Sequence, residues 1–200
     1  MERRRLLQLG GAVAGGAAVG VAIPTGDAGA NTTESPGEAD IGFCTDMTAH
    51  HVQALAMCQR VLGRATGDSV QAAATEVLTN QAMEVGQMRA WLTDWGESTA
   101  SPELVMGWMG MNDGAGMPLE MMPGLASAGE LRELSLADGI EQGRRWLVLM
   151  RAHHVGGVAM AEAATDLADL EKVRRLARAQ ADVQTYEISQ YDHLLSTTYR

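Results

Sequence analysis

The sequence predicts an all-α protein, an antiparallel four-helix bundle built from two duplicated helix hairpins. The first observation is an internal repeat: residues 47–57 recur as 150–160, and residues 81–88 recur as 184–191, both at an offset of 103 residues. The second is that apolar residues recur at helical spacing, whereas strand-like alternation is absent. A constant offset over two blocks indicates two copies of one supersecondary unit, each burying its apolar face against the other.

Residues 1–30 are predicted to be an export signal. A start with three arginines precedes a weakly apolar stretch, and residues 28–30 form an A-x-A cleavage site. The arginines followed by two leucines resemble the twin-arginine pattern, with an ordinary secretory signal or a retained anchor as the alternatives. We therefore expect export to the periplasm, the cell envelope or the extracellular space, with residues 31–39 as a flexible linker.

Composition and charge limit the classes of partner. The chain has 200 residues, of which 46% are hydrophobic, and this content excludes a largely disordered protein. The net charge of −10 argues against nucleic acid, whose phosphates require a basic face, and leaves metal ions as partners. No stretch after the signal approaches the roughly 18 apolar residues of a membrane span, so no membrane association is expected once the signal is removed.

The bundle domain is expected over residues 40–198, with one short helix besides the four long ones. Glycines follow the first and second long helices, as is typical of helix ends. Short turns within each pair make the paired helices antiparallel neighbours. A long connection, residues 97–126, joins the two pairs, and a capping box at 127–130 opens the short helix that follows it. The long helices are expected at residues 40–62, 68–95, 140–167 and 171–196.

Histidines and amide or carboxylate side chains are predicted to form a polar layer inside the bundle. On a helical wheel, His51 lies near the centre of the apolar stripe and His50 at its edge, so one histidine of each doublet should point into the core. Counting from the turns places His51 level with Gln81, and His154 level with Gln184. Such a layer either fixes helix register through its own hydrogen bonds or binds a metal ion. The predicted layer is His51, Gln81, Glu84, His154, Gln184 and Glu187.

Thioethers and thiols near the histidine doublets are candidate ligands of a soft metal ion. The two cysteines lie 14 residues apart on one helix, a rise of roughly 21 Å, which rules out a disulfide between them in a straight helix. They are either buried thiols that act as small hydrophobic side chains or part of a soft-metal site. The candidate ligands are Cys44, Met47, His50, His51, Met57, Cys58, Met150, His153, His154 and Met160. The residues expected to contact these ligands without binding the metal are Gln81, Glu84, Met88, Gln184 and Glu187.

The long connection between the hairpins is unusually rich in methionine. Loops rarely need this much apolar mass, and soft thioethers prefer Cu(I) or Ag(I). The alternative is a lid whose adaptable methionines pack over one end of the bundle. The loop methionines are Met106, Met109, Met111, Met117, Met121 and Met122.

The duplicated blocks resemble the bacterial domain-of-unknown-function family 305. They have the form M-x-x-H-H-x-x-A-x-x-M followed by Q-x-x-E-[VI], and a Met-Pro-Gly stretch at 122–124 is similar to the family's middle segment. The resemblance covers about residues 40–196 and implies a ferritin-like bundle; some members are exported copper-binding proteins. Two positions depart from the pattern, since Gly143 is the counterpart of Asp40 and Tyr191 that of Met88.

These observations favour a protein without enzymatic activity. Di-iron oxidases of this shape need Glu-x-x-His pairs, and the sequence contains none. Neither a G-x-S-x-G elbow nor a zinc-protease H-E-x-x-H is present. We expect an exported protein that binds copper for storage or tolerance in the envelope. The alternative is a structural or partner-binding bundle without metal, and a homo-oligomer remains open for either.

Overall fold

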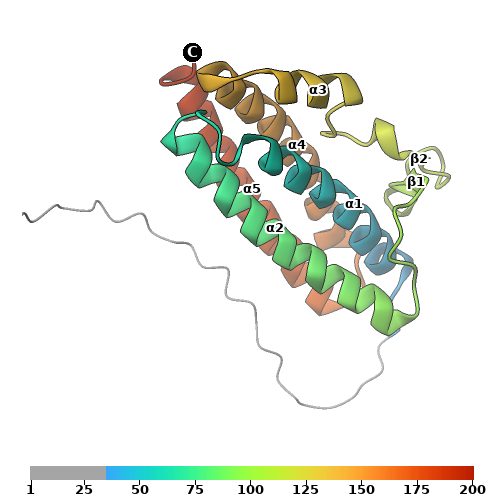
Figure 1. Ribbon diagram of the computed structural model, residues 1–200. Helices are drawn as coiled ribbons and strands as arrows, with labels where there is room; N and C mark the ends of the chain where they lie inside the picture. Colours follow the sequence, from blue (N-terminus) through green and yellow to red (C-terminus); the bar gives the residue numbers. More distant parts are fainter. Residues whose placement is uncertain (1–34) are drawn as a thin grey trace, which may run out of the picture. The chain divides into compact units, whose positions relative to one another are not determined.

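The computed structural model describes residues 35–200, which form five α-helices and one small sheet (Figure 1). The fold is the predicted helical bundle, and the predicted ends of the long helices agree with the observed ones to within two residues. Helix α1 begins inside the predicted linker 31–39, and the predicted export signal lies outside the described residues. The α-helices are α1 (Glu38–Val61), α2 (Asp68–Trp95), α3 (Ala128–Leu136), α4 (Gly139–Leu167) and α5 (Glu171–Ser196).

The four long helices pack as two hairpins. Helix α1 packs along α2, α4 packs along α5, and the hairpins meet mainly through α1 and α4. Helix α2 ends at Gly96, whose φ of 80° is a left-handed conformation that glycine adopts without strain. Helix α3 begins with the predicted capping box, because the Ser127 backbone N–H donates to the Glu130 carboxylate at 2.8 Å. The architecture thus follows from local signals in the sequence.

A buried carboxylate on α1 seals the turn between α4 and α5. Asp40 accepts hydrogen bonds from the backbone N–H groups of Asp169 at 3.3 Å and Leu170 at 3.0 Å, although the two residues are about 130 positions away. These groups precede the first turn of α5, where backbone donors lack partners within the helix. Asp40 is fully buried, so it stabilises the turn in a site without competing water.

The turn between α1 and α2 is sealed differently, which explains why position 143, the counterpart of Asp40, is glycine. A Cβ on Gly143 would lie 2.5 Å from the carbonyl oxygen of Thr66, in the turn between α1 and α2. That carbonyl instead accepts a hydrogen bond from the Tyr199 hydroxyl at 2.7 Å. An aspartate at 143 would therefore collide with the α1–α2 turn, whereas its counterpart Asp40 stabilises the α4–α5 turn.

The connection between the hairpins runs along the outside of the bundle from the end of α2 to α3 (Figure 1). It contains a two-stranded antiparallel sheet, β1 (Leu104–Val105) and β2 (Met117–Pro118), with Val105 opposite Met117. The 3-10 helices η1 (Gly107–Met109) and η2 (Leu119–Met121) follow the two strands. The sheet corrects the prediction that strands are absent. Two-residue strands are too short to produce an alternating sequence pattern.

The core consists of two hydrophobic clusters on either side of the histidine doublets. On α1 the first cluster includes Met47 and the second includes Met57, with the doublet between them. We call the first the methionine cluster; its sulfur-containing members are Cys44, Met47, Met88, Met106, Met122 and Met160. We call the second the aromatic cluster; it includes Met57, Cys58, Trp146, Met150, Tyr191 and Tyr199.

Candidate metal centre

All four doublet histidines are fully buried at the centre of the bundle. The helical wheel predicts only one inward histidine per doublet, and this prediction is wrong. Each of α1 and α4 packs against two helices, so both histidines of a doublet find a buried face. His50 and His153 meet where α1 contacts α4, with ring centroids 3.6 Å apart and an angle of 31° between the rings. His51 and His154 face the partner helix of their own hairpin.

Each hairpin contains one buried carboxylate–imidazole pair. The His51 Nε2 lies 2.7 Å from the Glu84 Oε2, and the His154 Nε2 lies 2.6 Å from the Glu187 Oε2. The histidine side chains are 0% exposed, and the glutamate side chains are 13% and 11% exposed. When the imidazole is neutral, Nε2–H donates to the carboxylate and Nδ1 carries the lone pair. The pairs therefore orient the two imidazoles and leave Nδ1 as an acceptor.

The layer around these pairs contains many polar atoms without a hydrogen-bond partner in the described part of the chain. The His51 and His154 Nδ1 atoms are among them. An unpartnered buried polar group costs about 1–3 kcal/mol, so their concentration in one layer requires an explanation. A bound cation would satisfy the ring nitrogens. The layer's other buried polar atoms without a hydrogen-bond partner are His153 Nδ1, the side-chain amides of Gln81 and Gln184, and the Tyr191 hydroxyl.

The stacked pair stays neutral because of its surroundings. Burial lowers the pKa of His50 and of His153 well below the ordinary value, and the neighbouring imidazoles lower it further. The His153 Nε2 lies 2.9 Å from the His50 carbonyl oxygen, which accepts its hydrogen. Neutral imidazole is the form that binds metal ions.

The four repeat methionines flank the histidine layer, two on each side. Met47 and Met160 lie in the methionine cluster, and Met57 and Met150 in the aromatic cluster. All four are fully buried, as is Met88. The position equivalent to Met88 is Tyr191, whose ring centroid lies 5.4 Å from that of His154. The two sides of the layer thus differ in sulfur content despite the repeat.

The two cysteines lie on opposite sides of the histidine layer. Both are free and buried, Cys44 in the methionine cluster and Cys58 in the aromatic cluster. Burial raises the pKa of the Cys58 thiol to about 12, and burial together with the nearby Asp40 charge raises the pKa of Cys44 still further. Both side chains are therefore protonated at neutral pH and do not share a site.

The loop methionines cover the whole range from buried to exposed. Met106 and Met122 are buried in the methionine cluster, and Met109 and Met117 are partly buried against it. Met111 and Met121 are 38% and 66% exposed. The structure therefore brings four of the six to the methionine cluster and leaves two in contact with solvent.

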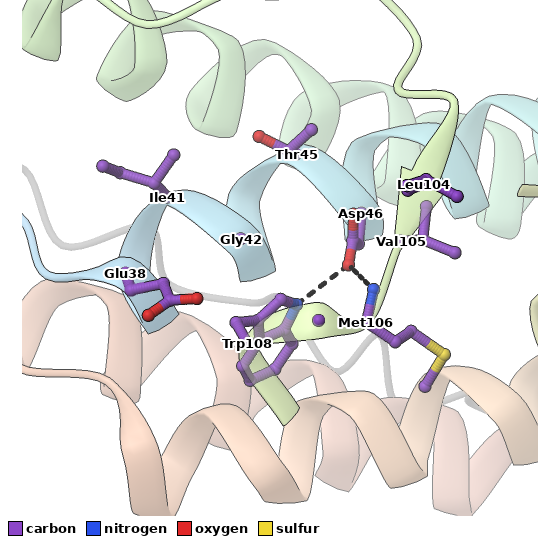
Figure 2. Close-up of a pocket in the computed structure, with 10 residues that line it drawn as sticks. Glu38, Ile41, Gly42, Thr45, Asp46, Leu104, Val105, Met106 and Trp108 are labelled. Atoms are coloured by element: carbon purple, nitrogen blue, oxygen red, sulfur yellow. Dashed lines mark hydrogen bonds between the residues drawn. The ribbon is translucent and has the colours of Figure 1, made fainter. Parts of the chain in front are cut away.

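Asp46 attaches the loop to α1, and the sequence analysis did not single it out. Its Oδ2 accepts hydrogen bonds from the Met106 backbone N–H at 2.7 Å and the Trp108 Nε1–H at 2.8 Å (Figure 2). Burial raises the pKa of Asp46, and these two hydrogen bonds oppose the rise. The residues line an open pocket of about 280 Å³. The available signal in the sequence was a charged residue directly before Met47, on the helix that carries the first histidine doublet.

The Met-Pro-Gly stretch lies against α4 beside the second doublet. A Cβ on Gly156 would clash with the Pro123 carbonyl oxygen, so only glycine allows this approach. A Cβ on Gly124 would lie 2.9 Å from the His153 carbonyl oxygen, and its φ of 89° is left-handed. The side-chain amide of Gln53 then holds the Ala126 backbone through hydrogen bonds of 2.6 and 2.9 Å.

The donor set is suited to a soft metal ion rather than a hard one. In residues 35–200, no group of three or more histidine, cysteine, aspartate or glutamate side chains is arranged to hold a metal ion. A metal in the layer would need thioether sulfur beside imidazole nitrogen, a combination that copper accepts and calcium or magnesium does not. Separately, none of the helices in residues 35–200 combines the length and the apolar content that crossing a membrane requires.

Comparisons with known proteins identify a family and several similar structures. The sequence profile of DUF305, a domain of unknown function, matches residues 40–195. A DUF305 protein from Streptomyces coelicolor is 35% identical, with a TM-score of 0.72, and the match covers 79% of this chain and 92% of that one. A DUF305 fragment from Deinococcus radiodurans is 29% identical, with a TM-score of 0.67 and coverage of 80% and 97%.

A more distant similarity is to CopM in its Cu(I)-bound form, at 22% identity and a TM-score of 0.62, covering 80% of this chain and 98% of that one. Structures of CopM in Cu(II)-bound and Ag-bound forms match at TM-scores of 0.61 and 0.60. At this identity the similarity establishes a shared fold alone. None of the curated proteins matches the sequence.

Proposed function

The chain belongs to the DUF305 family, and from that premise we propose that it binds a soft metal ion, copper above all, outside the cytoplasm. Its role would be storage of the metal or tolerance to it, without enzymatic activity. The predicted export signal and the acidic net charge of −10 support this role. The Streptomyces coelicolor relative, whose name describes it as secreted, supports an extracytoplasmic location.

The observation that carries the proposal is the pair of oriented imidazoles with free Nδ1 atoms. Metal-binding histidines usually donate the other ring N–H to a carboxylate, which fixes the ring and raises its basicity. Glu84 and Glu187 have this relation to His51 and His154, at 2.7 and 2.6 Å. Helix register alone would not require two buried Nδ1 atoms without partners.

Sulfur on both sides of the layer supports copper over zinc or iron. Met47 and Met160 lie on one side of the imidazoles, and Met57 and Met150 on the other. Soft thioethers favour Cu(I), and imidazoles also accept Cu(II). When bound, copper would be held by these nitrogen and sulfur atoms. CopM, which shares the fold, has solved structures in Cu(I)-bound, Cu(II)-bound and Ag-bound forms.

One observation favours the alternative of a bundle without metal. His50 and His153 stack at 3.6 Å, and His153 also donates to the His50 carbonyl, so part of the layer satisfies itself. A structural or partner-binding protein could use such a layer to fix the register of α1 against α4. The two functions predict different responses to metal.

A thermal-shift series with the purified protein distinguishes them. A ligand that binds only the folded state raises Tm, and the increase grows with the logarithm of the ligand concentration relative to its Kd. We expect Cu(I) and Ag(I) to raise Tm and Zn(II) to raise it less, because the layer offers thioethers and few charged ligands. An unchanged Tm with all three ions would contradict the proposal and support the metal-free bundle.

A further inference from the structure

We propose that the loop from β1 to η2 is the port through which a soft monovalent cation enters the methionine cluster. Its methionines would pass the ion from solvent to the core by exchange between thioethers. This inference rests on the proposed function, but it concerns a different set of residues from the histidine layer. It assigns a binding role to Met109 and Met117, which lie between the exposed and the buried methionines.

Graded exposure of the thioethers is the first observation. Met111 and Met121 are 38% and 66% exposed, whereas Met106 and Met122 are 5% and 2% exposed. Met109 and Met117 are intermediate and pack directly against the buried methionine cluster. Met106 and Met122 share this cluster with Met47 and Met160, which are fully buried. Among the described residues, the loop therefore contains thioethers at every level of exposure, from solvent to the buried cluster.

Backbone hydrogen bonds place three of these methionines in one turn of the loop. The N–H groups of Met109 and Met111 both donate to the Met106 carbonyl oxygen, at 3.2 and 3.3 Å. One tight turn therefore carries a buried, a partly buried and an exposed methionine. Met117 lies on the adjacent strand, opposite Val105. Exchange between neighbouring soft ligands requires this kind of proximity.

Met106 has a strained backbone conformation that the surrounding structure must hold. Its φ is 64°, in the left-handed region that costs a residue with a Cβ about 1–2 kcal/mol. Gly110, Gly114 and Gly116 in the same loop have positive φ and are glycine, as expected. Strained residues of this kind concentrate at ligand sites, where the surrounding structure holds them.

Asp46 stabilises this conformation of the loop through hydrogen bonds. It accepts hydrogen bonds from the Met106 N–H and the Trp108 Nε1–H, and the Trp108 ring packs on α1 where Gly42 leaves room (Figure 2). The loop is thus fixed to α1, while Met106, Met109 and Met117 pack in or against the methionine cluster. Within residues 35–200, the aromatic cluster on the opposite side of the histidine layer contains two methionines, Met57 and Met150, both fully buried, and so offers no graded series.

The test compares silver uptake by the full-length protein and two variants. Ag(I) is the probe, because it is a soft monovalent ion that undergoes no redox change on binding thioethers. In Met109→Leu/Met117→Leu, leucine keeps the apolar volume and removes the sulfur. Met83→Leu is the matched control, since Met83 is 50% exposed on α2, away from the loop. Stopped-flow tryptophan fluorescence gives the rate of uptake, and elemental analysis gives the amount bound at equilibrium.

We expect the double variant to take up Ag(I) roughly tenfold more slowly than wild type, since the soft ligands of the intermediate step are gone. The amount bound by the histidine layer and the buried cluster should remain, and Met83→Leu should match wild type. An unchanged rate in the double variant would overturn the port and leave the proposed function intact. Absence of bound silver in wild type would instead overturn the proposed function, and the port with it.

Methyl resonances of ¹³C-labelled methionine in the wild-type protein give a second measurement that does not depend on how the variant folds. As Ag(I) is added, the Met109 and Met117 methyl signals should shift together with or before those of Met47 and Met160. Shifts of the buried signals while the Met109 and Met117 signals stay constant at every step would overturn the port.

Discussion

His50 and His153 stack at the centre of the bundle, with ring centroids 3.6 Å apart. They occupy equivalent positions in the two repeats, so the stack marks the point where the two hairpins meet. Neither imidazole is exposed, and burial keeps the pKa of both well below the ordinary value. The stability of the whole fold is therefore tied to the protonation of this pair.

The stacked pair predicts that the protein loses stability as the pH falls below about 6.5. Below that value the unfolded chain protonates both histidines and the folded chain does not, so the unfolded state binds more protons. The free energy of unfolding then rises with pH, by up to about 2.7 kcal/mol per pH unit for two groups. Above the unfolded pKa their contribution is constant. Urea midpoints between pH 7.5 and 5 measure the slope.

Two variants test whether this slope comes from the stacked pair. The double variant His50→Gln/His153→Gln should have a flatter profile, because glutamine does not titrate. His193→Gln removes an exposed histidine outside the repeat and should leave the wild-type slope. Equal slopes in all three proteins would show that other groups control the acid sensitivity.

Replacing the oriented imidazoles should remove copper from the protein. His51→Ala/His154→Ala deletes the two Nδ1 ligands of the proposed site, and we expect most of the bound copper to be lost. Glu84→Gln/Glu187→Gln keeps the imidazoles but weakens their orientation, and should reduce affinity by about 10- to 100-fold. Elemental analysis and competition with a Cu(I) chelator measure the two effects.

His193→Ala serves as the control for nonspecific binding to surface imidazole. It should retain the wild-type amount of copper, since His193 lies outside the layer and is exposed. If His51→Ala/His154→Ala, correctly folded by circular dichroism, contains as much copper as wild type, the assignment of these histidines as ligands is wrong.

Both thiols should be unreactive in the folded protein. Cys44 and Cys58 are 0% exposed, and the pKa of Cys58 is about 12. At pH 8 that pKa leaves about one Cys58 side chain in ten thousand as the reactive thiolate. A thiol-specific chromogenic reagent should therefore report two thiols in guanidinium chloride and almost none without it. Rapid reaction of either cysteine under native conditions would show that its surroundings open readily.

The docking of the loop on α4 predicts opposite effects for two glycine substitutions. Gly156→Ala should destabilise the protein by more than 1 kcal/mol, because a Cβ there meets the Pro123 carbonyl and must displace the segment. Gly86→Ala, on α2, has open space around the new Cβ and should stabilise by about 0.5–1 kcal/mol. Chemical denaturation of both variants measures the difference. A Gly156→Ala protein as stable as wild type would contradict the observed docking.

Much of the fold could be predicted because its signals are local. Glycine stops, a capping box and the helical period locate the ends of α2 and the start of α3 within a few residues. The two-residue strands and the second inward histidine of each doublet could not be predicted this way. Both depend on what packs against the segment, and a wheel of one helix assumes a single buried face.

The candidate site shows the same division. The sequence by itself determined which residues carry nitrogen and sulfur, and the repeat placed them on matching turns of α1 and α4. Only the tertiary structure decided that His51 pairs with Glu84, that His50 stacks on His153, and that Asp46 holds the methionine loop. These contacts join residues 33 to 103 positions apart. The burial of several elements together selects them, and no periodicity within one helix encodes that packing.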